Sequence, residues 1–273
     1  MAGEVLNMNN LTINKHRCKL EVLCFKTATK PYTKRYPPLK NEIKMNENSC
    51  NITDKGKSCC SSPANTNSET NLKEHWNNAY LNSPEEKLGW FETDLTPTLN
   101  LVSNTNLDKD ARILNVGAGS TTLIDELINL GYINLIACDL SEIALEKLES
   151  RIKSSKVDYV VDDLTEPSKL TNIENVDLWI DRAVLHFFTK NNEQDEYFKL
   201  LKSKVNTNGF VILAEYHMNG ATVCAGLPVH RYSKEMLVER LGNKFELLES
   251  FEYTYLMPSG NERPYIYTLF RKK

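Results

Sequence analysis

The stretch RILNVGAGST, residues 112–121, decides the fold class. An apolar run of strand length, Arg112–Val116, leads directly into Gly117-Ala118-Gly119, and a helical pattern follows over Thr122–Leu130. Glycines let the backbone turn tightly and approach a ligand, and the helix N-terminus behind them presents free N–H groups. The sequence therefore predicts a strand–loop–helix unit that binds a ligand at its loop.

The same alternation of strand-length apolar runs and helix-period segments continues on both sides of this stretch. It predicts a doubly wound, Rossmann-like α/β fold with helices on both faces of a central sheet. A closing pair of strands makes the sheet mixed, with about seven strands in all. The expected strands after the first are Asn134–Cys138, Val157–Val161, Val176–Ile180, Phe210–Ala214, Phe245–Tyr255 and Tyr265–Phe270, and the further helices are Glu142–Ile152 and Gln194–Lys204.

Acidic residues at the ends of these strands indicate the kind of ligand. Asp139 follows Gly117 by 22 residues and ends the second strand, where a carboxylate can accept hydrogen bonds from both hydroxyls of a ribose. The dinucleotide fingerprint G-x-G-x-x-G would need glycine at position 122, where this chain has Thr122. With Asp163 and Asp181 ending later strands, the pattern favours a nucleoside without phosphates and argues against an NAD-dependent reductase.

Taken together, these motifs resemble those of class I S-adenosylmethionine (SAM)-dependent methyltransferases, in order and spacing. The resemblance covers about residues 70–273. The opening block His75–Tyr80, the pair Trp90-Phe91 and the string Asp181–Phe187 (DRAVLHF) resemble a subgroup with an HW…Y lead-in. Some of these strings also resemble lysine methyltransferases that act on elongation factor. Two positions depart from the common pattern, because Asn115 stands where an acidic residue is usual and Thr121 where a small one is.

The resemblance implies SAM as cofactor and a set of residues that bind it. The glycines would lie against the methionine part, Asp139 would hold the ribose, Asp163 and Leu164 would flank the adenine, and Asp181 would line the methionine end. The full set of implied cofactor-binding residues is Trp76, Tyr80, Trp90, Asn115, Gly117, Ala118, Gly119, Ser120, Thr121, Asp139, Leu140, Ser141, Asp162, Asp163, Leu164, Asp181 and Arg182.

Two further roles stay open from the sequence. The aromatic side chains of Trp76, Tyr80, Trp90 and Phe91 can close over a sulfonium, because aromatic faces attract cations, or they can pack on the core. His186 is the candidate catalytic base, just past the fourth strand; the alternatives are a packed histidine and a reaction that needs no base.

The expected methyl acceptor is either a small molecule or a protein side chain. The alternative function is that of a non-catalytic module that binds SAM. The sequence after the fourth strand lacks the Asp-Pro-Pro-Tyr-like or Pro-Cys element that the resemblance associates with many DNA base methyltransferases. Residues 45–273 carry 24 basic and 33 acidic side chains. Because phosphate contacts need a basic face, this charge also argues against nucleic acid as the acceptor.

The first 69 residues differ from the rest and are expected to form a disordered, basic extension of the methyltransferase domain at 70–273. Residues 1–44 hold nine Lys/Arg and three Glu, so they are either a mitochondrial presequence or an unstructured tail of a cytoplasmic protein. No apolar run is long enough to cross a membrane.

The pair Cys59-Cys60 with Cys224 could trap a soft ion, but it lacks the C-x₂-C spacing of zinc sites, and no metal is expected.

Overall fold

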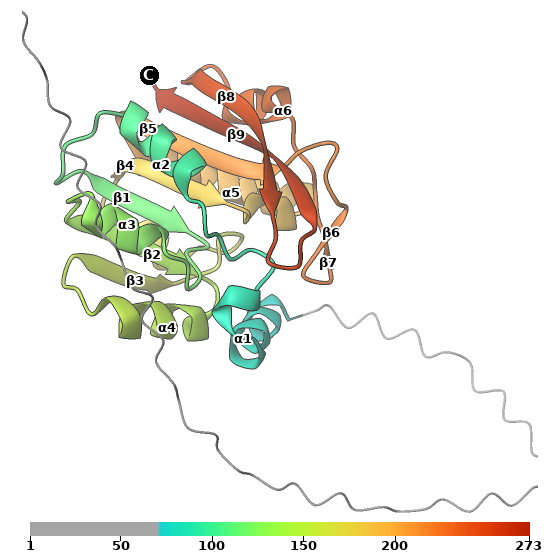
Figure 1. Cartoon of the computed structure of the whole chain (residues 1–273). Coiled ribbons are helices and arrows are strands. Elements are labelled where there is room, and N and C mark those ends of the chain that lie inside the picture. Colours follow the sequence, from blue (N-terminus) through green and yellow to red (C-terminus); the bar gives the residue numbers. More distant parts are fainter. Residues whose placement is uncertain (1–70) are drawn as a thin grey trace, which may run out of the picture. The chain divides into compact units, whose positions relative to one another are not determined.

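The computed structural model describes residues 71–273, so the expectations for the N-terminal extension and for Cys59-Cys60 lie outside the described residues. The described part folds around one seven-stranded mixed sheet with the order β3-β2-β1-β4-β5-β9-β8 (Figure 1). Its strands are β1 (Arg112–Val116), β2 (Asn134–Asp139), β3 (Val157–Val161), β4 (Val176–Arg182), β5 (Val205–Tyr216), β8 (Phe245–Leu256) and β9 (Glu262–Lys272). The predicted fold class is confirmed.

Helices cover both faces of this sheet, because successive strand residues point to opposite sides. Ile113 packs with buried side chains of α2 (Thr96–Asn104), α3 (Leu123–Asn129) and α4 (Glu142–Ile152). Its neighbour Leu114 packs on the opposite face with α5 (Asn191–Lys204) and α6 (Lys234–Leu241). The result is a three-layer α/β/α arrangement.

The first five strands run parallel, and the last two complete the sheet in the antiparallel sense. β9 pairs with β5 from Phe210↔Arg271 to Tyr216↔Tyr265, and β8 then pairs along most of β9. From β1 the chain adds β2 and β3 on one side of the sheet, and it then returns to add β4 and β5 on the other side of β1. The strand order therefore reverses between β1 and β4. Open α/β sheets bind ligands at such a point, beyond the carboxyl ends of the strands.

Shorter elements gather near that edge of the sheet. They are α1 (Leu72–Asn82), the 3₁₀ turns η1 (Glu85–Lys87) and η3 (Leu185–Phe187), and the small hairpin of β6 (Val223–Cys224) and β7 (Leu227–Pro228). A third 3₁₀ turn, η2 (Leu170–Asn172), precedes β4, and its Thr171 carbonyl accepts a hydrogen bond from Lys204 just before β5. Figure 1 shows α1 and the β6–β7 hairpin at the side to which the arrowheads of β1 and β4 point. None of the helices in the described residues is both long and apolar enough to cross a membrane.

Most of the predicted boundaries agree with the structure to within a few residues, and two differ for clear local reasons. The helix expected from Gln194 begins at Asn191, because the Glu193 carboxylate accepts the Lys190 backbone N–H and caps the first turn. The strand expected at Phe210–Ala214 begins at Val205, which pairs with Val176; residues 206–209 form an irregularity before the pairing resumes at Phe210 opposite Leu178.

Candidate functional site

The glycine loop after β1 forms the floor of the site. Gly117 and Gly119 adopt the left-handed conformation, with φ of 58° and 56°. A Cβ on Gly117 would come within 1.9 Å of Val184 Cγ2, and one on Gly119 within 2.4 Å of the Tyr80 hydroxyl. The two glycines are therefore required both by their backbone angles and by the close approach of neighbouring side chains.

Asp139 ties this loop to the next helix. Its Oδ2 accepts the Gly119 backbone N–H at 2.8 Å, and its Oδ1 accepts the Ser141 backbone N–H at 2.8 Å. Ser141 then caps α4 by accepting the Ala144 N–H. Burial raises the pKa of Asp139 to about 6, although the backbone hydrogen bonds oppose this shift. A carboxylate is thus held at the end of β2 with lone pairs left for a ligand.

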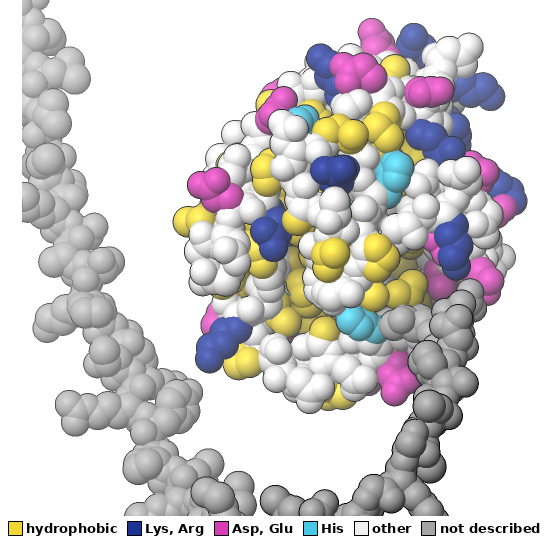
Figure 2. All heavy atoms as spheres, turned by 90° about the vertical axis from the view of Figure 1, so that its right-hand side faces the viewer, with side chains coloured by type: hydrophobic (Ala, Val, Ile, Leu, Met, Phe, Trp, Pro, Cys, Tyr) yellow, Lys and Arg dark blue, Asp and Glu magenta, His cyan; other side chains and the backbone are white. Residues whose placement is uncertain are grey.

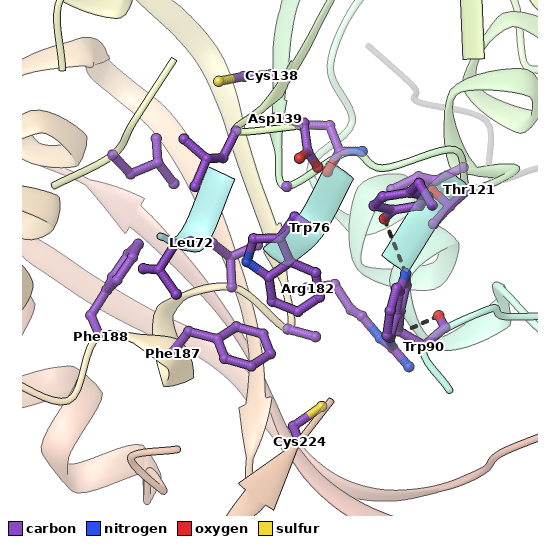
Figure 3. Close-up of a pocket in the computed structure, with 18 of the residues that line it drawn as sticks. Leu72, Trp76, Trp90, Thr121, Cys138, Asp139, Arg182, Phe187, Phe188 and Cys224 are labelled. Carbon is purple, nitrogen blue, oxygen red and sulfur yellow. Dashed lines mark hydrogen bonds between the residues drawn. The ribbon is translucent and has the colours of Figure 1, made fainter. Parts of the chain in front are cut away.

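A cavity of about 1090 Å³, counting the space open to solvent, lies over the loop and Asp139. Figure 3 shows Asp139 and Cys138 on one side of the cavity and Cys224 on the opposite side, with Trp76, Phe187 and Arg182 between them. The lining residues are Leu72, Trp76, Tyr80, Trp90, Glu92, Asn115, Gly117, Thr121, Leu123, Cys138, Asp139, Leu140, Asp162, Asp163, Leu164, Arg182, Ala183, Val184, Phe187, Phe188, Cys224 and Tyr265.

Asp162 and Asp163, which follow β3, fix the loop that forms the cavity wall on the same side as Asp139. The Asp162 carboxylate accepts the backbone N–H groups of residues 168–170, which fixes the loop that follows. The Asp163 carboxylate accepts both the N–H and the hydroxyl of Thr165. Leu164 between them is buried and faces the cavity. This wall therefore offers an apolar surface framed by carboxylates.

An aromatic cluster forms the opposite wall and part of the roof. The Trp90 indole N–H donates to the Tyr80 hydroxyl at 3.0 Å. The Trp76 ring packs edge-on against Trp90 and against Phe187, with centroids 5.4 and 4.9 Å apart. Trp76, Tyr80 and Trp90 thus pack on one another and also line the cavity, whereas Phe91 does not line it. Closure of these rings over a sulfonium stays a prediction.

A buried ion pair lies at the end of the cavity nearest these aromatic rings. The Arg182 Nε lies 3.1 Å from Glu92 Oε1, and both side chains are almost fully buried. The guanidinium also packs over the rings of Tyr255 and Tyr265, each with its centroid 4.7 Å away. Burial raises the pKa of Glu92, and Arg182 opposes that shift. The pair places one carboxylate and one cation in an otherwise aromatic environment.

Figure 2 views the face that carries α1 and the β6–β7 hairpin. Hydrophobic side chains gather in a hollow near the middle of this face, and charged side chains lie mainly around it. Among residues 71–273, no three or more His, Cys, Asp or Glu side chains are arranged so that they could hold a metal ion. The site is therefore an apolar hollow with a few placed polar groups.

Several residues expected in the site do not line the cavity. The loop residues Ala118, Gly119 and Ser120 and the cap Ser141 lie behind its surface. Asp181 is fully buried and accepts hydrogen bonds from the Tyr197 hydroxyl at 2.6 Å and from the Val184 N–H at 3.0 Å. Burial, and then the nearby Glu215, raise the pKa of Asp181 well above its usual value.

His186 is also fully buried and cannot touch a ligand in the cavity directly. Its Nδ1 lies 2.8 Å from Glu215 Oε2. Sequence reasoning missed Glu215, although an acidic residue inside the apolar strand Phe210–Tyr216 was a detectable signal. It also missed Glu92 and Tyr265, which come to the cavity from outside the glycine-loop unit and carry no local motif.

Comparisons with known proteins identify the kind of fold and of enzyme that the chain resembles. A family model described as a methyltransferase domain matches residues 113–209. EEF1A lysine methyltransferase 2 of Danio rerio is 27% identical over 199 residues, covering 66% of this chain and 78% of that protein. The protein of the same name from Homo sapiens is 23% identical, with coverage of 69% and 81%. A SAM-dependent methyltransferase from Anabaena variabilis superposes with a TM-score of 0.60 at 15% identity, covering 74% of this chain and 93% of that one.

Proposed function

We propose that this chain, a SAM-dependent methyltransferase, transfers the methyl group to the side-chain amine of a lysine in a protein. The observation that carries the choice of acceptor is the likeness to two proteins named EEF1A lysine methyltransferase 2, which extends over about four fifths of their length. The elongation factor EEF1A is therefore the first substrate to test. Residues 70–273 are proposed as the methyltransferase domain, acting in the cytoplasm unless residues 1–44 direct the chain to mitochondria.

The described residues support a definite place for the cofactor. The Asp139 carboxylate would accept the ribose hydroxyls, since each of its oxygens keeps a lone pair after bonding the backbone. Asp163 and Leu164 would flank the adenine, and the backbone of Gly117 would meet the methionine part. Asn115, Thr121, Leu140, Asp162 and Arg182 line the same cavity, whereas Ala118, Gly119, Ser120, Ser141 and Asp181 would act from behind it by shaping the loop.

The aromatic end of the cavity suits the acceptor. When bound, SAM supplies an electrophilic methyl group on a positively charged sulfur. The rings of Trp76, Trp90 and Tyr265 can hold that charge, and a neutral or cationic amine beside it, because aromatic faces attract cations. We expect a long unbranched side chain to enter this end and to exclude water as it does so.

In this arrangement the chain contributes mainly orientation. Phe187 and Trp76 would confine the amine to one line of approach, and the Glu92–Arg182 pair would fix the rings that face it. Alignment of two reactants in this way can supply about 7–11 kcal/mol of the barrier. A transfer of this kind needs no metal ligand from the chain.

The experiment is a transfer assay with methyl-labelled SAM and purified EEF1A. Label on one or more EEF1A lysines, located by peptide mass spectrometry and lost when the labelled lysine is changed to arginine, would support the proposal. Asp139→Ala serves as the matched enzyme control and should transfer little label. Label that appears in a small-molecule extract and not in protein would contradict the lysine acceptor and favour a small-molecule substrate.

A further inference from the structure

A chain of buried acid–base groups ends at the cavity on the side away from Asp139. Glu215 lies on β5, His186 on η3 and Cys224 on β6, so three separate elements bring the groups together. Glu215 and His186 are fully buried, and Cys224 is a partly buried free thiol that lines the cavity. Burying ionisable groups is costly unless they are paired, which makes a cluster of this kind a candidate for function.

Contacts connect Glu215 to His186, and connect His186 to Cys224 through Tyr216. Glu215 Oε2 accepts the His186 backbone N–H at 3.1 Å and lies 2.8 Å from the ring nitrogen Nδ1. The other ring nitrogen, Nε2, is buried and has no hydrogen-bond partner. The Tyr216 ring stacks on the imidazole with centroids 4.4 Å apart, and its hydroxyl lies 3.1 Å from Cys224 Sγ. The imidazole and the thiol are thus held on the same tyrosine.

The acid–base behaviour of Cys224 follows from its surroundings. Burial alone would raise its pKa, but interactions with His186, Tyr216 and Arg182 lower it below the ordinary thiol value. Tyr265 on β9 also faces the thiol and adds no positive charge. Cys138, which is buried on the other side of the cavity, has its pKa raised by burial and by Asp139. The two cavity thiols are therefore shifted in opposite directions.

We propose that Cys224 is the group that takes the proton from the ammonium of the incoming acceptor, with His186 and Glu215 as positioning residues behind it. This rests on the proposed function, because it requires an amine acceptor. It also explains how a histidine that cannot reach the cavity can still contribute to catalysis there.

The proton transfers balance with solvent as the final acceptor. An N–H bond of the ammonium breaks and an S–H bond forms on the Cys224 thiolate, which leaves a neutral amine with a free lone pair. The cavity is open to solvent, so water then takes the S–H proton and the thiolate is restored for the next turnover. His186 stays in place behind the thiol, because its Nδ1 faces Glu215 and its ring stacks on Tyr216. The arrangement follows the logic of other cysteine–histidine–carboxylate groups, in which the third member orients the second.

The first test reads the thiol directly and needs no acceptor. Wild-type full-length protein is treated with iodoacetamide across a range of pH, and alkylation of the peptides that carry Cys224 and Cys138 is measured by mass spectrometry. Alkylation of Cys224 should reach half its maximal rate at a pH below the usual thiol pKa, and His186→Gln should move that point upward. Cys138 is the internal control and should react slowly. A Cys224 profile that resembles an ordinary thiol, or that His186→Gln leaves unchanged, would overturn the proposal.

The second test measures transfer. Cys224→Ser should lower kcat for lysine methylation at least tenfold at neutral pH, and the rate should recover at higher pH as the amine loses its proton unaided. The affinity for SAM, measured by calorimetry, should stay within twofold. Val223→Ala, at an exposed neighbour on β6, is the matched control and should keep the wild-type rate. A wild-type pH profile in Cys224→Ser would refute the role.

The failure of the two proposals can be told apart. If wild-type protein methylates no lysine, the proposed function fails, while the alkylation profile still reports whether His186 activates Cys224. If lysine methylation occurs and Cys224→Ser leaves it unchanged, the proposed function stands and the role of Cys224 is refuted.

Discussion

Replacing Gly117 by alanine tests the packing of the glycine loop. At φ of 58° an L-residue costs about 1–2 kcal/mol relative to glycine. The new Cβ would also lie 1.9 Å from Val184 Cγ2, and crowding of that kind costs about 1–3 kcal/mol. We therefore expect the free energy of unfolding to fall by about 2–5 kcal/mol. Because both residues line the cavity, the affinity for SAM should fall at least tenfold as well.

The assay is urea unfolding together with calorimetric titration of SAM. Gly131→Ala is the matched control: φ is 94° there, but the nearest atom to a Cβ is Lys109 Cδ at 3.8 Å, so only the backbone cost applies. The double variant Gly117→Ala/Val184→Ala should be more stable than the sum of the single changes predicts, by about 1–3 kcal/mol. Equal losses in Gly117→Ala and Gly131→Ala, with additive effects in the double variant, would refute the contact with Val184.

Three further predictions concern charged groups. Because the pKa of Asp139 is about 6 and its ionised form would accept the ribose hydroxyls, SAM should bind about tenfold more weakly at pH 5 than at pH 7, and equal calorimetric affinities would contradict this. Arg151 donates to the carbonyl oxygens of Ser120 and Thr121 at 2.7 Å each, so Arg151→Ala should lower the free energy of unfolding by about 1–2 kcal/mol. The control Lys199→Ala, at an exposed position, should change it little. Equal losses for the two variants in urea unfolding would refute a stabilising role for the Arg151 hydrogen bonds. Glu215 has a pKa of about 8, above its usual value of 4.5, so its contribution to stability is complete below about pH 4.5 and is lost as pH rises through 8. In Glu215→Gln, which cannot ionise at this position, the unfolding free energy should fall less between pH 4.5 and pH 8 than in the wild type, by at most about 5 kcal/mol. Parallel pH profiles of stability for the two proteins would contradict the raised pKa of Glu215.

The core of the fold could be predicted because its signals are local. Arg112–Val116 is a strand followed by glycines, and the apolar residues of Glu142–Ile152 recur at helical spacing, so each element can be inferred from its own residues. The pairing of β9 with β5 joins residues far apart in the sequence, such as Leu213 and Thr268, and the pattern indicated only that two strands close the sheet.

The site was less accessible to sequence reasoning because a motif gives the position of a residue and not its direction. Asp181 and Arg182 both end β4, but side chains alternate along a strand. Asp181 therefore points to Tyr197 of α5, whereas Arg182 points into the cavity. His186 lies one short turn further on, where η3 directs its ring toward Glu215. Glu92 reaches the same cavity through its pair with Arg182, a contact across 90 residues that no local pattern encodes.

The most direct measurement is a crystal structure of the full chain with S-adenosylhomocysteine and a lysine peptide that the enzyme methylates. We predict that the ribose hydroxyls lie on the Asp139 carboxylate, and that the lysine Nζ enters between Trp90, Tyr265 and Cys224. A nucleoside bound elsewhere, or a lysine that approaches from the side of Asp163, would contradict the proposed site.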